Sequence, residues 1–277
     1  MHFHRFGAAG RKVRLDRISP DPPDDVTKHH AHRRFDELNE ELFGLQDLMW
    51  GARTHAVLVV LQGRDAAGKD GSIKHVVGAL NPRGVAVTSF GPPTEEERQH
   101  DFLWRVHRHA PRAGEFGIFN RSHYEDVLVV RVRKLAPPHT WKERFDQINA
   151  FEQTLAAANT IVLKYFLHIS RHEQKERLLE REKDPDDAWK LNVDDWRDRE
   201  KWDGFTEAYE DAIGRCASPD APWIVVPANA KWYRNLVIAE SLAAALRPYR
   251  KKWRRTLEDE GKVARRDLEE YREKRKG

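Results

Sequence analysis

The sequence predicts an α/β fold in which helices cover both faces of a five-stranded parallel sheet. Five apolar runs have the length and composition of buried strands: 56–61, 84–90, 116–120, 160–169 and 222–227. Helical patterns separate these runs, at about 94–109, 122–134, 140–158 and 170–182. Such alternation favours parallel strands joined by crossover helices. A glycine-rich loop also follows the first run. Because ligands of such sheets bind beyond the carboxyl ends of the strands, we expect the loop and the ends of the neighbouring strands to converge on one site.

Composition narrows the class of protein. The chain has 277 residues, 34% of them charged, which suits one large or two small domains. Its single cysteine, Cys216, excludes a disulfide framework and a cysteine-rich metal site, and we expect it to be a packing residue. No apolar stretch approaches the ~20 residues of a membrane helix, and the first residues lack the apolar core of a signal peptide. We therefore expect a cytoplasmic protein that binds neither membrane nor nucleic acid.

The first 33 residues contain three prolines and several aspartates, which predicts an irregular N-terminal arm. The histidines at 29, 30 and 32 could bind a metal, but solvated side chains are the favoured interpretation. From Phe35 to Met49, apolar residues recur at helical spacing and predict an amphipathic helix that leads into strand 56–61.

The loop that follows this strand reads Gly63-Arg64-Asp65-Ala66-Ala67-Gly68-Lys69, and run 72–80 after it has a helical pattern. The loop fits G-x-x-x-x-G-K, in which backbone N–H groups and a helix N-terminus cradle phosphate and the lysine adds an ammonium group. A chance glycine-rich turn is the alternative, but the flanking strand and helix favour a phosphate site. Besides Lys69, the predicted phosphate- and nucleotide-binding residues of this segment are Gly63, Ala66, Ala67, Gly68, Asp70, Gly71 and Ser72.

Asp65 and Asp70 depart from the common form of this loop. A carboxylate at position 65 would repel phosphate unless a cation lay between them, and Asp70 replaces the usual Ser or Thr. The simplest solution is Mg²⁺, or Mn²⁺, held between Asp65 and the phosphate oxygens, since Mg²⁺ takes one or two carboxylates together with substrate oxygens. The hydroxyl of Ser72 is a weaker candidate ligand.

A second polar segment, 120–126, directly follows strand 116–120. Asn120 occupies the place where an acidic residue commonly organises Mg²⁺, and it can still offer a carbonyl oxygen. The guanidinium of Arg121 can bridge two phosphate oxygens. Glu125 either offsets a helix dipole or contacts an acceptor group or its metal.

Two later segments are rich in charge. Residues 183–202 include three tryptophans and form either a surface helix pair or a mobile cover, which in phosphotransferases excludes water. Residues 250–277 hold 12 Lys/Arg and 7 Asp/Glu, so they account for the net charge of +4 and leave the rest of the chain close to neutral. We expect a solvated C-terminal helix there, with polyanion binding as the alternative.

These segments together resemble the polyphosphate kinase 2 family. The resemblance spans about 35–249 and rests on dispersed motifs in the right order: 63–71, 81–84, 119–127, 189–192 with Asp195 and Trp202, and 221–227. It implies a P-loop kinase-like fold similar to thymidylate kinase, formed by residues 34–249, with a helical lid at about 183–202. The sequence His-Tyr-Glu-Asp-Val after Asn-Arg-Ser is similar to class III, whose members phosphorylate both AMP and ADP.

The resemblance also implies roles for individual residues. Asp65 becomes a metal-site carboxylate, Lys69 a phosphate ligand and Arg121 a phosphate contact. Arg181 becomes a lid-proximal arginine required for transfer, and Glu125 a position that handles the nucleotide acceptor. Asn120 departs from members that carry Asp at this position. A homodimer or homotetramer is implied as well.

We therefore expect reversible transfer of a terminal phosphoryl group from inorganic polyphosphate to AMP and ADP, which gives ADP and ATP. Lys69, Arg121, Arg181 and Mg²⁺ would offset the repulsion between two polyanions. Lys74, Arg83, Arg131 and Arg133 could extend a basic track for the polymer or be ordinary surface charges. An ATP-dependent nucleoside monophosphate kinase and a non-enzymatic polyanion-binding module remain as alternatives.

Overall fold

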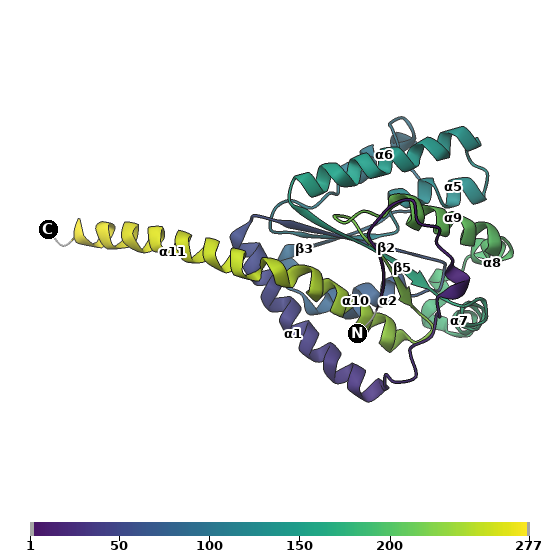
Figure 1. The fold of residues 1–277 in the computed structure, drawn as a ribbon, viewed down its shortest axis with the longest axis horizontal. Helices are drawn as coiled ribbons and strands as arrows, with labels where there is room; N and C mark the ends of the chain where they lie inside the picture. The colour runs from purple at the N-terminus through teal and green to yellow at the C-terminus, as the bar shows by residue number, and fades with distance from the viewer. Residues whose placement is uncertain (1–2, 276–277) are drawn as a thin grey trace.

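The computed structural model describes residues 3–275, and a six-stranded sheet lies at its centre (Figure 1). The order of its strands is β1-β6-β5-β2-β4-β3. The strands are β1 (His4–Phe6), β2 (Ala56–Gly63), β3 (Val85–Ser89), β4 (Phe116–Asn120), β5 (Thr160–His168) and β6 (Trp223–Pro227). The last five are parallel, which confirms the predicted sheet and its helical layers.

The prediction of five strands in all was wrong, because β1 pairs antiparallel with β6 at the edge of the sheet. This strand has only three residues and lies in the arm that was predicted to be irregular. It is defined by backbone pairing with Trp223–Val225, so no apolar period marks it in the sequence.

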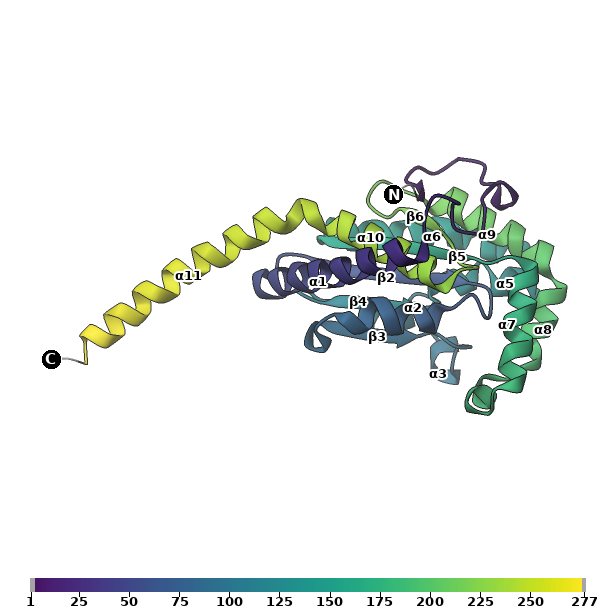
Figure 2. The same cartoon turned by 90° about the horizontal axis from the view of Figure 1, so that it is seen from below.

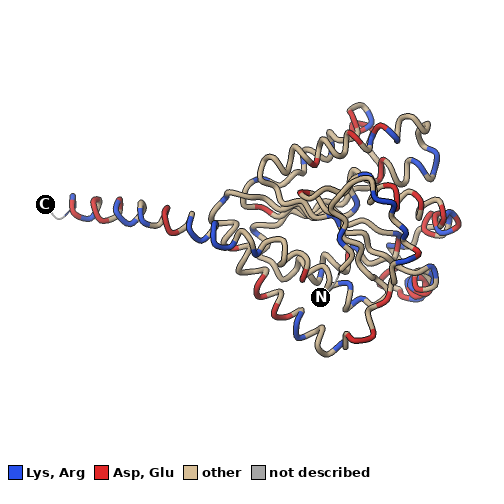
Figure 3. Tube along the Cα trace, viewed as in Figure 1, with Lys and Arg blue, Asp and Glu red and all other residues tan. Residues whose placement is uncertain are grey.

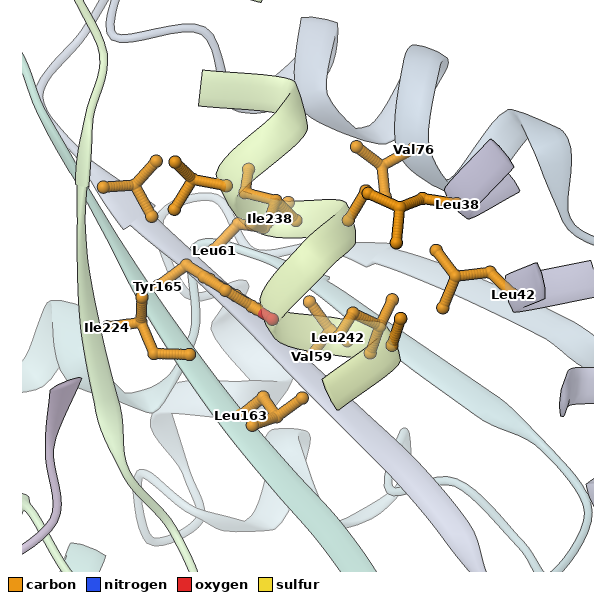
Figure 4. Packing of buried hydrophobic residues seen from close by; sticks show 14 of the residues in the cluster. Leu38, Leu42, Val59, Leu61, Val76, Leu163, Tyr165, Ile224, Ile238 and Leu242 are labelled. Carbon is orange, nitrogen blue, oxygen red and sulfur yellow. The ribbon is translucent and has the colours of Figure 1, made fainter. Parts of the chain in front are cut away.

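Two helical layers cover the sheet. Alternate residues of β2 point to opposite faces, and all eight are buried. Val59 and Leu61 face α1 (Lys28–Ala52), α2 (Lys69–Val76) and α10 (Lys231–Leu246), where Figure 4 shows them beside leucines of α1 and α10. Leu58 and Val60 face the layer formed by α6 (Pro138–Ala157) and α9 (Trp202–Cys216).

Several helices differ from their predicted bounds. Helix α1 begins at Lys28, where the Thr27 side chain accepts a hydrogen bond from His30 N, so the clustered histidines lie on its first turns. The helix expected at 94–109 is divided into α3 (Glu95–Arg98) and α4 (Trp104–His107), and the one expected at 122–134 into the 3-10 helix η4 (His123–Asp126) and α5 (Val129–Val132). Further 3-10 helices are η1 (Leu15–Arg17), η2 (Val77–Ala79), η3 (Pro82–Gly84) and η6 (Arg247–Tyr249).

The carboxyl edge of the sheet places the two predicted motifs together. Leu61 is in register with Asn120, and Gly63 is in register with Leu167 of β5. Beyond this edge lie α7 (Arg171–Lys183), η5 (Pro185–Lys190) and α8 (Val193–Glu200), which project together from the sheet (Figure 2). The expected convergence of the loop with the ends of β4 and β5 is thus confirmed, and segment 183–202 lies at the site.

The last helix, α11 (Arg250–Glu273), leaves the body of the protein at the end opposite α7 and α8 (Figure 1). Trp253 near its start is fully buried, whereas its later part carries alternating basic and acidic residues (Figure 3). Within residues 3–275, no helix is long and apolar enough to span a membrane.

Candidate active site

The glycine-rich loop curves from the end of β2 into α2. Gly68 has a φ of 102°, in the left-handed region, and a Cβ there would lie 1.8 Å from Arg234 Nη1. Only glycine satisfies both the backbone conformation and this close approach. Helix α2 then begins at Lys69, so its free N–H groups and partial positive charge are directed at the loop.

The ammonium group of Lys69 lies within the curve of the loop. Its Nζ donates hydrogen bonds to the carbonyl oxygens of Gly63 at 2.7 Å and of Arg64 at 3.2 Å. Burial and the nearby Arg121 cation lower the pKa of Lys69, while Asp65 and Glu125 oppose this shift. A partly buried cation with carbonyl partners only is well suited to interact strongly with an anion that reaches the loop.

Two buried arginines that the sequence did not indicate support the loop from behind. Arg177 of α7 donates to the carbonyl oxygens of Ala66 at 3.0 Å and Ala67 at 3.2 Å. Arg234 of α10 is only 2% exposed and donates to Ala67 O at 3.3 Å. Burial, with a contribution from Arg177, lowers the pKa of Arg234 to about 10. Both residues lie in ordinary helical sequence, so no motif marks them.

Arg64, by contrast, turns away from the phosphate-binding side of the loop. Its Nη2 donates to Trp202 O at 3.0 Å and to Thr206 Oγ1 at 2.6 Å, and its guanidinium lies 3.7 Å from the centre of the Trp202 ring. These contacts join the loop to the first turn of α9, directly after α8.

Arg121 and Asp65 connect the two sequence motifs. Arg121 Nη2 donates to Asp65 Oδ1 at 2.8 Å, so the guanidinium balances the negative charge of a carboxylate that would otherwise repel phosphate. Arg121 has a φ of 61°, and its backbone N–H donates to Leu61 O at 3.0 Å. Glu125 lies nearby, and burial raises its pKa against the opposing attraction of Arg121 and Lys69.

Asn120 lies beside α2. Its Nδ2 donates to Asp70 Oδ1 at 2.7 Å. Asp70 replaces the usual Ser or Thr of the loop, and Asn120 replaces the usual Asp after β4. Asn120 Oδ1 is buried and has no hydrogen-bond partner among residues 3–275. The two departures from the common sequence patterns are thus in direct contact.

Carboxylates of α8 meet arginines from two directions. Arg181 Nη1 donates to Asp195 Oδ2 at 2.9 Å, and Arg133 forms two hydrogen bonds with Asp198, at 2.9 and 2.8 Å. Burial and the neighbouring Asp65 carboxylate raise the pKa of Asp195 to about 6. Through these ion pairs α8 is held over the loop.

Two cavities meet beneath α8. The larger, of about 990 Å³, extends between the loop, α1, α10 and α7, and is lined by eight lysines and arginines and seven carboxylates. The smaller, of about 280 Å³, lies between η4, α5, α8 and α9, and has apolar walls from Phe90, Val130 and their neighbours. Four residues line both cavities, and we call them the common wall: Asp65, Arg121, Asn192 and Asp195.

Most of the predicted site residues line these cavities. The larger is lined by Asp65, Ala66, Gly68, Lys69, Asp70, Gly71, Asn120, Arg121 and Arg181, and the smaller by Gly63, Asp65, Arg121 and Glu125. Ala67 and Ser72 line neither. Ala67 is a core residue, and the Ser72 hydroxyl donates to Gly68 O at 3.1 Å, so it points into the helix.

Other predictions about charged residues have mixed outcomes. Arg133 lines the smaller cavity, whereas Arg131 pairs with Asp211 at 2.6 Å, and neither Lys74 nor Arg83 lines either cavity. The larger cavity also includes residues of α1 and α10 that sequence reasoning missed, Lys28 and Lys231 among them. A lysine on an amphipathic helix gives no sign of what it faces.

The carboxylates at the common wall suit a hard divalent cation. Residues 3–275 contain no cluster of three or more His, Cys, Asp or Glu side chains that could hold a metal ion. Asp65 and Asp195 are nevertheless close enough for their charges to interact unfavourably. Mg²⁺ needs few protein ligands when phosphate oxygens and water complete its coordination, so these oxygen donors fit it.

Comparison with known proteins gives one consistent result. Residues 25–254 match the sequence model described as polyphosphate kinase 2. The chain is 48% identical to the AMP/ADP-polyphosphate phosphotransferase of Meiothermus ruber, over 89% of this chain and 92% of the relative. It is 40% identical to the ADP-polyphosphate phosphotransferase of Rhodopseudomonas palustris, over 79% and 80%. The crystal structure of polyphosphate kinase 2 from Arthrobacter aurescens TC1 superposes with a TM-score of 0.82 at 37% identity, over 87% of this chain and 90% of that one.

Proposed function

The chain belongs to the polyphosphate kinase 2 family, and from this premise we propose that it transfers the terminal phosphoryl group of inorganic polyphosphate to AMP and to ADP. It is a polyphosphate-dependent nucleotide kinase. Two cavities meet at Asp65 and Arg121, and this observation is the basis for assigning each substrate to one cavity. A donor in one cavity and an acceptor in the other would bring their reacting phosphates to this common wall.

The larger cavity suits the polymer. Its cations come from six separate parts of the fold and include Lys28, Lys69, Arg181 and Lys231. An extended polyanion can contact widely spaced cations, and such contacts recognise charge without recognising a base.

The smaller cavity suits the nucleotide. Apolar side chains form much of its wall, namely Phe90, Pro92, Pro93, Val129, Val130, Leu135 and Phe205. A base and a ribose bury apolar surface that polyphosphate lacks, so these walls favour AMP and ADP. Arg121 and Glu125 lie at the inner end, where the acceptor phosphate would be held.

The reaction needs cations more than it needs a base. The attacking oxygen of AMP or ADP is already ionised, so the protein has to align two polyanions and to stabilise charge on the transferring group. Arg121 is hydrogen-bonded to Asp65, the charge of Lys69 interacts with both, and Arg181 of α7 pairs with Asp195. We propose that Arg121 moves between Asp65 and the substrate phosphates as these bind. When bound, Mg²⁺ or Mn²⁺ held by Asp65 would supply further positive charge between the phosphates.

A time course tests the proposal. Purified protein is incubated with AMP, Mg²⁺ and polyphosphate, and in a parallel reaction with ATP in place of polyphosphate. We expect ADP to appear first and ATP to follow in the polyphosphate reaction. Reaction that stops at ADP would contradict the two-acceptor proposal, and product only from ATP as donor would contradict the choice of donor.

We also propose that the protein is a homodimer or homotetramer. The outer part of α11 carries three large apolar side chains that stay exposed within residues 3–275: Val263, Leu268 and Tyr271. Light scattering of the full chain and of a chain that ends at Gly261 tests this proposal, because the shorter chain keeps the buried Trp253. A monomeric full chain would contradict it, and a shorter chain that stays oligomeric would place the interface elsewhere.

A further inference from the structure

A closed network of buried polar side chains lies on the α6 side of the sheet, and the reaction described above does not use it. It consists of His123 and Tyr124 of η4, Glu152 of α6 and Lys164 of β5, all at most 2% exposed. We call these four residues the anchor cluster. Lys164 Nζ donates hydrogen bonds to Glu152 Oε2 and to Tyr124 Oη, the second at 3.0 Å. Tyr124 Oη donates to Glu152 Oε1 at 2.9 Å.

The charges in the anchor cluster are matched. Burial alone would raise the pKa of Glu152, but the Lys164 ammonium and a hydrogen bond from His123 outweigh it and lower the pKa. His123 Nε2 lies 3.1 Å from Glu152 Oε1, and Nδ1 has no partner among residues 3–275. Nε2 donates in this contact, since an ionised carboxylate can only accept. Lys164 and Glu152 form the buried ion pair of the cluster.

The anchor cluster is joined to the site through the backbone of η4. Arg121 and Glu125 line the smaller cavity. His123 and Tyr124, which lie between them in the sequence, point into the core. Arg121 holds a left-handed φ of 61°, which a non-glycine residue adopts only where its surroundings enforce it. The segment is too short to hold this conformation by itself, because η4 has only four residues.

Lys164 reaches a second part of the site as well. Its Nζ donates to the carbonyl oxygen of Cys216, the last residue of α9. The first turn of α9 accepts the hydrogen bonds from Arg64 of the loop, and Tyr209 in its middle lines the smaller cavity. A single buried ammonium thus fixes both η4 and α9 relative to the central sheet.

We propose that the anchor cluster positions Arg121 and Glu125 for the nucleotide acceptor. This inference rests on the proposed function, because it takes the smaller cavity as the acceptor site. Tyr124, Glu152, Lys164 and His123 are positioning residues, since they face away from both cavities. Their contribution is to fix the backbone around η4, from which the Arg121 and Glu125 side chains reach the smaller cavity.

The alternative is that the anchor cluster only contributes to stability, as many buried polar networks do. The neighbouring residue on β5 offers a matched control. Tyr165 is also fully buried, but its ring lies on the opposite face of the sheet (Figure 4), and its Oη accepts a hydrogen bond from Ser241 at 3.1 Å. Removal of either hydroxyl deletes one buried hydrogen-bonding group, yet only Tyr124 belongs to η4.

The experiment compares Tyr124→Phe with Tyr165→Phe. Melting temperatures are measured first, and steady-state kinetics with ADP and polyphosphate are then recorded well below both midpoints, so that each variant is fully folded. We expect both variants to melt a few degrees lower than the wild type. Only Tyr124→Phe should lose about tenfold in kcat/KM for ADP, with its KM for polyphosphate unchanged within about twofold, a loss of the size that a misplaced binding group causes.

Equal kinetics of the two tyrosine variants would overturn the inference, as would a loss that appears equally in both substrates. A wild-type protein that makes no ATP from ADP and polyphosphate would contradict the proposed function instead. Should Tyr124→Phe not fold, His123 provides a second pair. His123→Gln keeps an N–H donor near Glu152 and should keep kcat/KM for ADP close to the wild-type value. His123→Leu has no such donor and should lower kcat/KM for ADP. Equal values for these two variants would also overturn the inference.

Discussion

The two cavities of this protein share a wall but are built from different parts of the chain. The larger lies over the glycine-rich loop and takes its other walls from α1, which precedes the loop in the sequence, and from α7 and α10 in the second half of the chain. The smaller is formed mainly by residues 90–135 and by α8 and α9. Eight lysines and arginines balance seven carboxylates in the larger, whereas four arginines face six carboxylates in the smaller, which has most of the apolar side chains.

This difference suggests how one site can hold two anions that repel each other. The polymer would be held by charge spread over a wide surface, and the nucleotide by its base and ribose, so that few cations are needed in the second cavity. The cations at the common wall can then act on the reacting phosphates. A change in one cavity should therefore affect one substrate, whereas a change at the common wall should affect both.

The largest effect is expected from Lys69→Ala. The ammonium lies in the curve of the loop, lines the larger cavity and is close enough to Arg121 and Asp65 for their charges to interact. Removal of one preorganised charge of this kind costs about 10²- to 10³-fold in kcat, and we expect the same loss with AMP and with ADP. Initial rates at saturating substrates measure it.

Lys74→Ala is the matched control, because Lys74 is an exposed lysine on the same helix that lines neither cavity. It should keep wild-type rates. Activity of Lys69→Ala within tenfold of the wild type would mean that the loop does not hold the transferring phosphate.

A pair of substitutions tests the assignment of substrates directly. Val130→Phe adds bulk inside the smaller cavity, and Lys231→Gln removes a cation from the larger. We expect Val130→Phe to raise KM for AMP about tenfold, since overpacking costs about 1–3 kcal/mol. Lys231→Gln should raise KM for polyphosphate only. The opposite pattern, or a change in both KM values for each variant, would contradict the division between the cavities.

Sequence reasoning recovered the parts of the site that are local in the chain. The glycine-rich loop, the segment after β4 and the cover at 183–202 each occupy a continuous stretch, and the register of β2 with β4 places the first two together. Arg177 and Arg234 were missed because their role comes from tertiary packing of α7 and α10 against the loop. Strand β1 was missed because three residues carry no period, and Arg64 gave no sign that it faces α9 rather than phosphate.

Ionic strength offers a test without mutation. Interactions of a polyanion with dispersed, partly solvated cations are screened by salt, whereas apolar contacts are not. Between about 50 and 300 mM KCl we expect KM for polyphosphate to rise several-fold and KM for AMP to change by less than about twofold. KM values that rise in parallel would show that charge dominates both cavities.

The smallest expected effect concerns Asp195, on the common wall. Burial and Asp65 raise the pKa of Asp195 from 3.8 to about 6. Between these values the folded protein binds a proton that the unfolded chain has released, so this group makes the free energy of unfolding fall as the pH rises from about 4 to 6. Because Asp195 keeps some solvent contact and pairs with Arg181, we expect a loss of about 1 kcal/mol across this window.

Asp195→Asn should remove this loss. The unfolding free energy of the variant minus that of the wild type, measured by urea titration, should therefore increase as the pH rises from about 4 to 6. Asp187→Asn is the control, because Asp187 lines only the larger cavity and a hydrogen bond from Lys190 lowers its pKa. The contribution of Asp187 to stability therefore changes mainly below about pH 4, and this variant should show little pH dependence from about pH 4 to 6. If Asp195→Asn shows no pH-dependent difference, Asp195 and Asp65 do not interact as like charges. The common wall would then lack the excess of negative charge that a divalent cation is proposed to relieve.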